Sequence, residues 1–174
     1  MENQELVSQF LKKRSEKSFS KLYHLHTPHL YKMALRLTQN TNESEELIQE
    51  LWIIAIRKLP EFEWRSELRT WLIGILINLS KAQYQKRKNH EEMVDKGNTN
   101  SFESNFQASY DLEKAIGQLP RGYREVFILH DIDGYKHKEI AGLLNVTEGT
   151  SKSQLFQARK ALREYLEADK YQTK

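Results

Sequence analysis

The stretch EIAGLLNVTEGTSKSQLFQARKAL, residues 139–162, predicts two helices joined by a short turn. Asn145 and Val146 form the expected turn, and the hydroxyl of Thr147 is expected to cap the second helix by accepting a backbone N–H. Small or apolar side chains repeat at helical spacing along the second helix and should face inward: Ser151, Leu155, Ala158 and Leu162. This pattern predicts a helix-turn-helix.

The opposite face of the second helix is basic. Between Gly149 and Arg163 the chain has four basic residues and no acidic one. The residues expected on this outward face are Lys152, Phe156, Arg159, Lys160 and Arg163. Such a face fits DNA phosphates and the base edges of the major groove. The alternative is a solvated amphipathic helix in a small bundle, but the turn spacing and the charge segregation favour DNA binding.

Composition limits the class of protein. The 174 residues include 27 Lys and Arg, 24 Asp and Glu and no Cys, which excludes a disulfide framework. The longest apolar stretch without charge covers 11 residues, Thr70 to Ser80, whereas a membrane span needs about 20. The N-terminal MENQELVSQFLKKR does not resemble a signal peptide. We therefore expect a cytoplasmic protein without membrane insertion.

Nearly every other ordered-looking segment has helical periodicity, so the predicted fold is all-α. One apolar stripe contains Leu68, Trp71, Leu72, Ile75, Leu76 and Leu79. Pro28 and Pro120 are expected at the starts of helices. Residues 90–110 are rich in Asn, Ser and Glu and predict a flexible linker. We expect two small helical domains, residues 1–89 and 111–174, on either side of it.

An acidic segment, NESEELIQELW at residues 42–52, carries Glu46, Gln49 and Glu50 beside the apolar stripe of a helix. Acidic residues in a first helical turn are favoured by the helix dipole, which is one explanation for the pattern. The other explanation is that these residues form a protein-binding surface.

An aromatic segment, FEWRSELRTW at residues 62–71, breaks two predicted helices. Its aromatic side chains alternate with Arg65 and Arg69, and single-stranded nucleic acid is bound by rings that stack on bases and by cations that contact the backbone. The alternative is that the aromatic residues form a core between helices while the arginines lie at the surface.

The following helix ends in a basic segment, NLSKAQYQKRK at residues 78–88. Its cations are Lys81, Lys86, Arg87 and Lys88. They follow a half-helix that is apolar on nearly every side, which indicates burial or a shared interface. The basic end favours nucleic-acid backbone, with a plain solvated run as the alternative.

Catalytic patterns are absent from the sequence. His24, His26 and His29 are close along the chain, but His24 and His26 fall on different helix faces, and Pro28 is expected to separate His29 onto another helix. The chain has neither a nucleophile elbow nor a Gly-rich phosphate loop. We expect no enzyme activity, no metal and no cofactor.

Taken together, these segments resemble bacterial RNA polymerase sigma factors of the extracytoplasmic-function (ECF) type over nearly the whole chain. Residues 19–40 resemble the first conserved helices of the family, and residues 45–62 resemble its segment for the polymerase β′ clamp helices. Residues 65–83 are similar to the loop and helix that capture the promoter −10 element. Residues 119–162 are similar to the domain that reads the −35 element.

The resemblance implies a factor for transcription initiation that binds core RNA polymerase, through the β′ clamp helices and the β subunit. The implied polymerase contacts are Glu46, Gln49 and Glu50. With the charge pattern, it indicates contacts to single-stranded −10 DNA by Trp64, Arg65, Ser66, Glu67, Arg69, Asn78, Lys81, Lys86, Arg87 and Lys88. Contacts to duplex −35 DNA are expected from Thr150, Lys152, Ser153, Phe156, Gln157, Arg159 and Lys160.

The resemblance also has departures and an alternative. Gln154 and Gln157 stand where the family usually has Arg, which removes two cations but leaves amides able to pair with adenine. In the family the linker threads through the polymerase, and an anti-sigma factor is a common partner. The alternative function is a free-standing helix-turn-helix regulator whose N-terminal bundle dimerises or senses a ligand.

Overall fold

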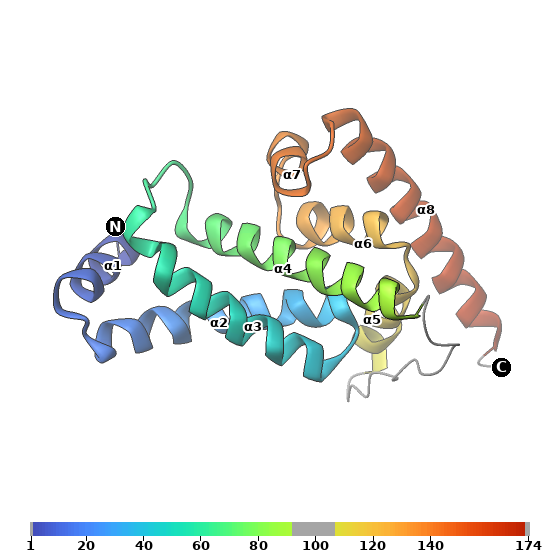
Figure 1. Ribbon diagram of the computed structural model, residues 1–174. Coiled ribbons are helices and arrows are strands. Elements are labelled where there is room, and N and C mark those ends of the chain that lie inside the picture. Colours follow the sequence, from blue (N-terminus) through green and yellow to red (C-terminus); the bar gives the residue numbers. More distant parts are fainter. Residues whose placement is uncertain (1, 92–106, 173–174) are drawn as a thin grey trace. The chain divides into compact units, whose positions relative to one another are not determined.

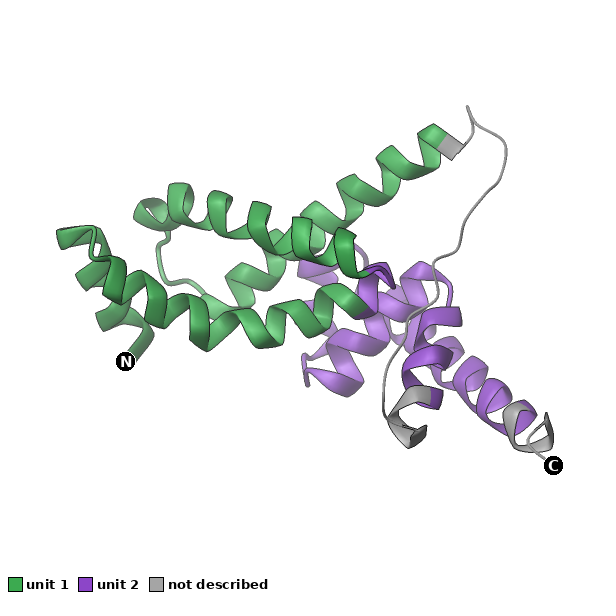
Figure 2. Cartoon of the chain, turned by 90° about the horizontal axis from the view of Figure 1, so that it is seen from below, with its two compact units in different colours: residues 1–35, 41–98 green, residues 36–40, 99–174 purple. Residues whose placement is uncertain are grey.

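A computed structural model describes residues 2–91 and 107–172 of the chain, and every regular element in these residues is helical (Figure 1). The contacts divide the chain into two compact units, residues 1–35 with 41–98 and residues 36–40 with 99–174 (Figure 2). The all-α prediction with two helical parts is confirmed. Each unit is described separately below.

The first unit is a helical bundle. Its elements are α1 (Glu2–Lys13), most of α2 (Glu16–Thr38), α3 (Thr41–Lys58), the short 3₁₀ helix η1 (Leu59–Glu61) and α4 (Leu68–Glu91). Helices α3 and α4 pack along each other. Trp52 of α3 reaches α2, where its indole N–H donates to the Thr27 hydroxyl at 2.9 Å and its ring lies edge-on to Phe19 at 5.6 Å. The core of this unit is therefore aromatic between α2 and α3.

The prediction that Pro28 begins a helix is wrong, because Pro28 lies inside α2. Proline removes one backbone donor from a helix, a loss that tertiary packing must offset. Buried side chains on both sides of Pro28, including Leu22, Leu30 and Met33, keep the helix continuous across it. His29 consequently lies on the same helix as His24, contrary to the expected separation.

His26 is buried and links two helices of the first unit. Its Nε2 lies 3.1 Å from Oδ1 of Asn3 on α1, so this hydrogen bond fastens α1 to α2. Burial lowers the pKa of His26, and the positive charges of Arg69 and His29 lower it further. The neutral ring is therefore the form that fits the folded unit.

The second unit contains a helix-turn-helix. Its elements are α5 (Gln107–Gln118), α6 (Arg121–Phe127), the π-helical turn η2 (Ile128–Ile132), α7 (His137–Leu144) and α8 (Glu148–Gln172). Helices α5, α6 and α7 all pack on α8. Asn145 has φ +56° at the turn between α7 and α8, a left-handed conformation that asparagine tolerates better than most residues. The predicted helix-turn-helix is confirmed, with the predicted turn.

The segment predicted as a linker lies mostly outside the described residues. Helix α4 continues to Glu91, and α5 begins at Gln107, within the predicted range of 90–110. Residues 92–106 belong to the part that the structure does not describe. Among the described helices, none is both long enough and apolar enough to span a bilayer.

Burial of His26 generates a pH prediction. The folded-state pKa lies below that of the unfolded chain, so below about pH 6.5 the unfolded state binds more protons and the stability of the first unit falls. The loss should reach at most about 1.4 kcal/mol per pH unit for this group. The measurement is urea unfolding at pH 8.0 and 5.5, followed by tryptophan fluorescence.

All three tryptophans of the chain lie between residues 52 and 71, so this fluorescence reports on the first unit. His26→Leu should flatten the pH dependence, whereas His90→Gln, at an exposed position, should retain it. An equal slope in the wild type and His26→Leu would contradict the assignment.

Candidate functional site

The loop between η1 and α4 brings three aromatic rings together. The ring of Phe62 lies between those of Trp64 and Trp71, with centroid distances of 4.9 and 4.8 Å. The first pair is tilted by 52° and the second by 30°. Because all three rings are only half-buried, they are packed together and still reachable from solvent. The rings therefore form a small cluster that remains partly exposed at the surface, and binding of single-stranded nucleic acid stays a prediction.

Trp64 has φ +56°, which is unusual for a bulky residue and costs about 1–3 kcal/mol. Beside it is an open hollow of about 280 Å³. The residues lining this hollow are Lys58, Glu61, Phe62, Glu63, Arg65, Ser66 and Trp71. Its mixture of aromatic, cationic and hydroxyl groups can stack on a planar ring and donate hydrogen bonds to it.

The polar residues of the loop differ in their surroundings. Arg65 is exposed and forms an ion pair with Glu63. Ser66 and Glu67 are exposed at the end of the loop, where the backbone oxygen of Glu67 accepts the N–H of Trp71 at 3.1 Å. Arg69 turns toward α2, where its Nη2 lies 2.9 Å from Nε2 of His29. Arg69 therefore belongs to the α2 contact as well as to the predicted DNA surface.

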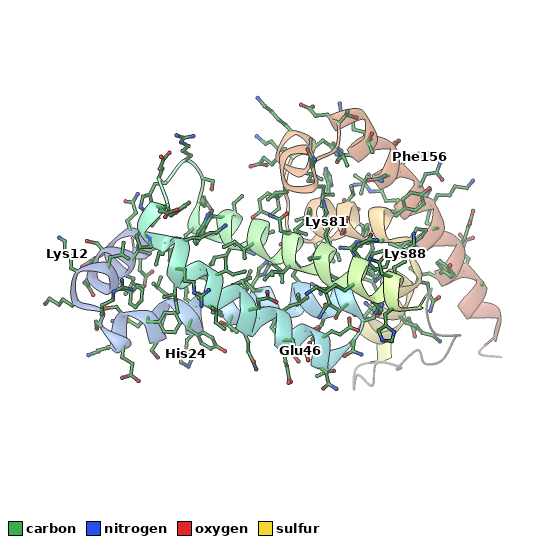
Figure 3. All side chains as sticks on the ribbon, in the orientation of Figure 1. Lys12, His24, Glu46, Lys81, Lys88 and Phe156 are labelled. Atoms are coloured by element: carbon green, nitrogen blue, oxygen red, sulfur yellow. The ribbon has the colours of Figure 1, made fainter. Side chains whose placement is uncertain are left out.

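Helix α4 carries the basic residues along its second half. Asn78, Lys86 and Lys88 are exposed, and Lys81 is half-buried. Figure 3 shows Lys81 and Lys88 on this helix. Arg87 pairs with Glu43 of α3 at 3.3 Å. Like Arg69, it also contributes to packing within its unit.

The acidic face of α3 has a composition that fits a protein interface. Glu46, Gln49 and Glu50 are all exposed on one face, and Figure 3 labels Glu46. Ile53 continues this face by one helical turn and is 51% exposed. An exposed aliphatic residue flanked by acidic ones is typical of a protein contact rather than of a DNA contact. The sequence reasoning missed Ile53, although its spacing from Glu46 and Gln49 is visible in the sequence.

The start of α8 is fixed by a cap at Thr147 and by a contact to α7. The Thr147 hydroxyl accepts the backbone N–H of Thr150 at 3.0 Å, which confirms the predicted cap of α8. Ser151 is fully buried, and its Oγ lies 2.8 Å from Nδ1 of His137 on α7. The predicted inward stripe is also confirmed, because Ser151, Leu155, Ala158 and Leu162 are all buried.

The outward face of α8 exposes most of the predicted −35 residues. Exposed side chains are Lys152, Ser153, Phe156, Gln157, Arg159 and Lys160, and Thr150 is half-buried at the cap. Phe156, labelled in Figure 3, is 63% exposed, a large fraction for an aromatic side chain. Arg159 differs from the lysines because its guanidinium contacts Asp131 of η2.

The expectation that Gln154 offers an amide to DNA is wrong, because its side chain is turned toward α6. Its side chain is half-buried and lies against α6, where a Cβ on Gly122 would come within 2.7 Å of its Nε2. The Oε1 atom is buried without a hydrogen-bond partner. Position 154 is three residues after Ser151 and four before Ala158, so it falls on the inward side of the helix.

Groups of three or more metal-ligating side chains arranged around a common point are absent from the described residues. The geometry instead defines two polar surfaces: an aromatic loop followed by a basic helix in one unit, and a helix-turn-helix in the other. A helix-turn-helix with a basic outward face is typical of DNA-binding transcription factors.

Comparison with known proteins specifies the family. The family model described as Sigma-70 region 2 matches residues 22–90, and the one described as Sigma-70, region 4 matches residues 109–162. The ECF RNA polymerase sigma factor EcfG of Rhodopseudomonas palustris (strain TIE-1) is 30% identical over 82% of this chain and 81% of its own length. The ECF RNA polymerase sigma factor SigW of Bacillus subtilis (strain 168) is 27% identical over 90% of this chain and 92% of its own length.

A solved structure agrees with the family matches. The sigma factor RpoE of Bartonella quintana, in complex with the anti-sigma factor NepR, superposes with a TM-score of 0.75 at 30% identity, over 88% of this chain and 99% of that one. The chain belongs to the ECF RNA polymerase sigma factors and serves transcription initiation. A free-standing regulator is not favoured, because the region 2 match covers most of the first unit.

The cap at Thr147 leads to a stability prediction for the second unit. Thr147→Ala leaves the N–H of Thr150 without its acceptor and should lower the free energy of unfolding by about 1 kcal/mol. Thr147→Ser keeps the oxygen and should cost less. Urea unfolding followed by far-ultraviolet circular dichroism measures both, and equal stability of the wild type and Thr147→Ala would contradict the cap's contribution.

Proposed function

We propose that this sigma factor binds core RNA polymerase through the exposed face of α3, captures the −10 element with the aromatic loop and α4, and docks α8 at the −35 element. The observation that carries the proposal is the separation of chemistry between the surfaces: acids with an apolar residue on α3, rings with cations at the loop and α4, and cations on α8.

Helix α3 is the proposed polymerase contact. Glu46, Gln49, Glu50 and Ile53 follow the spacing of a single helical face. Helices of a coiled coil such as the β′ clamp offer a surface against which a further helix can pack. In that arrangement Ile53 supplies the apolar centre and the acids supply charge complementarity at its border.

The aromatic loop is the proposed site for unpaired bases. A base removed from the duplex loses its stacking, and stacking on an aromatic side chain offsets about 1–3 kcal/mol of that loss. The Phe62 and Trp71 rings line the hollow, and Trp64 packs on Phe62. Along α4, Asn78 and the following cations would contact the backbone of the same strand.

Helix α8 is the proposed reader of the −35 duplex. Thr147 and Thr150 fix the start of the helix, and the side chains of Lys152, Phe156 and Lys160 extend from the exposed face. The lysines suit phosphates, and Phe156 suits an apolar contact such as a thymine methyl group. Neither arm makes or breaks a covalent bond in this scheme, so the chain acts as a binding factor and not as an enzyme.

A protein partner beyond the polymerase is also proposed. The structure of RpoE with NepR contains a sigma factor bound to an anti-sigma factor. We propose that an anti-sigma factor restrains this chain in the cytoplasm by covering its polymerase-binding or DNA-binding faces.

Polymerase binding is tested with the double variant Glu46→Ala/Glu50→Ala. Loss of two charges from the proposed contact should weaken binding to core RNA polymerase by about tenfold or more, measured by fluorescence anisotropy of the labelled chain. Glu2→Ala/Glu5→Ala changes the net charge equally on exposed positions of α1 and should bind like the wild type. Equal weakening by both double variants would contradict a specific α3 surface.

Base capture is tested with Trp64→Ala. Removal of this ring takes away the packing that holds Phe62 beside the hollow, so it should lower the affinity of the holoenzyme for single-stranded −10 DNA by about tenfold while leaving duplex −35 binding intact. Trp64→Phe keeps a ring and should lose less. Competition binding with labelled single strands measures the effect, and unaltered affinity in Trp64→Ala would exclude the ring from the contact.

A further inference from the structure

On the exposed face of α8, the cation of Arg159 is held by a carboxylate. Its Nε donates to Oδ2 of Asp131 at 2.8 Å, and its Nη2 donates to Oδ1 at 2.7 Å. Two parallel hydrogen bonds of this kind fix the plane of the guanidinium group. Lys152 and Lys160, by contrast, form no ion pair within the described residues. The face therefore combines mobile charges with one oriented arginine.

Asp131 is itself held from a second direction. It lies in the π-helical turn η2, where the Asp133 N–H reaches back to the Ile128 oxygen at 3.0 Å. Nδ1 of His130 lies 2.7 Å from Oδ1 of Asp131, and the His130 ring stacks on His137 at 4.6 Å. The carboxylate thus contacts His130 of its own turn, and the His130 ring in turn stacks on His137 of α7.

The charges of this pair are well defined. The hydrogen bond from Arg159 lowers the pKa of Asp131, with smaller contributions from His130, against the opposing effect of burial. The same hydrogen bond raises the pKa of Arg159. Both groups remain ionised at neutral pH, so their charges largely cancel at long range.

The geometry leaves one edge of the guanidinium available. Asp131 occupies Nε and one hydrogen of Nη2, which leaves Nη1 and the second hydrogen of Nη2. The Arg159 side chain is 48% exposed, whereas that of Asp131 is 20% exposed. Arg159 follows Lys152 and Phe156 by seven and three positions, so it lies on the same exposed face of α8.

We propose that Asp131 is a positioning residue that aims the free edge of Arg159 at a guanine of the −35 duplex. The inference rests on the proposed docking of α8 at that element. The N7 and O6 atoms of guanine accept two parallel hydrogen bonds from an arginine edge in the major groove. A neutralised, immobilised arginine adds little to attraction for phosphates but loses less side-chain entropy on binding a base.

A purely structural ion pair between η2 and α8 would behave differently. If the pair only fastened these elements, removing the carboxylate would weaken binding to every DNA sequence by distorting α8. If Asp131 positions Arg159, removing the carboxylate releases a mobile cation. Binding to unrelated DNA then stays equal or becomes tighter, while preference for the cognate sequence falls. The two roles therefore predict opposite changes in non-specific affinity.

The experiment uses the full chain bound to core RNA polymerase. Wild-type holoenzyme selects duplexes from a pool that is randomised at −35 and joined to a fixed, pre-melted −10 region. We expect enrichment of a guanine at one position, and replacement of that base by 7-deazaguanine should weaken wild-type binding. In Asp131→Asn that enrichment should disappear, with about a tenfold loss of discrimination between selected and scrambled duplexes.

The salt dependence of DNA affinity is a second measurement on the same variants. Asp131→Asn should bind scrambled duplex at least as tightly as the wild type, and its log–log salt slope should steepen by about one. Asp133→Asn makes the same charge change two residues away and should retain the wild-type preference. Arg159→Lys keeps the charge without the two-bond fork, so it should lose the guanine preference even if Asp131→Asn were poorly folded.

The possible results distinguish the docking of α8 at the −35 element from the positioning role of Asp131. Wild-type holoenzyme that shows no −35 preference would overturn the proposed docking and this inference with it. A wild-type preference that survives both Asp131→Asn and Arg159→Lys, or that contains no guanine sensitive to 7-deaza substitution, would overturn the inference alone. Equal weakening of selected and scrambled duplexes in the two variants would establish the structural role instead.

Discussion

Burial of the first half of α4 is the constraint on which the first unit depends. Leu72, Ile73, Leu76 and Ile77 are at most 1% exposed, so this part of the helix is covered on more than one side. Truncating a side chain in such a position typically costs about 2–5 kcal/mol. The same buried turns anchor the aromatic loop that precedes them and direct the basic half of the helix that follows. One packed segment thereby places both parts of the proposed −10 surface.

The helix-turn-helix was predictable because its signals are local. Thr147 caps the backbone N–H of a residue only three positions away, and the inward stripe from Ser151 to Leu162 follows from helical periodicity alone. The all-helical fold follows similarly from repeated apolar spacing. The acidic, aromatic and basic segments were also recognisable, since their composition is visible without knowledge of their neighbours. The residues that each segment contacts could not be recognised in this way.

Most of the failures depend on tertiary contacts. Pro28 remains inside a helix because the packing of α2 overrides a local preference. Gln154 differs, because its spacing from Ser151 and Ala158 already places it on the inward side of α8, where α6 approaches it at Gly122. On α4 the predicted stripe omitted Ile73 and Ile77, which are buried, although the apolar composition of this half-helix on nearly every side indicated burial beyond one stripe. The ion pair between Asp131 and Arg159 joins residues 28 positions apart, for which the sequence carries no periodic signal.

The left-handed backbone at Trp64 has a consequence for engineering. Glycine adopts that conformation without steric cost, so Trp64→Gly would relieve the backbone strain at this position. The same change would remove the packing of the ring on Phe62 and add backbone freedom to the unfolded chain, and both losses oppose the gain. Under the proposed capture of −10 bases by this loop, a bulky aromatic residue in this conformation exchanges local backbone strain for a ring at the binding surface. Stabilised versions of this chain should therefore be screened for promoter opening as well as for melting temperature.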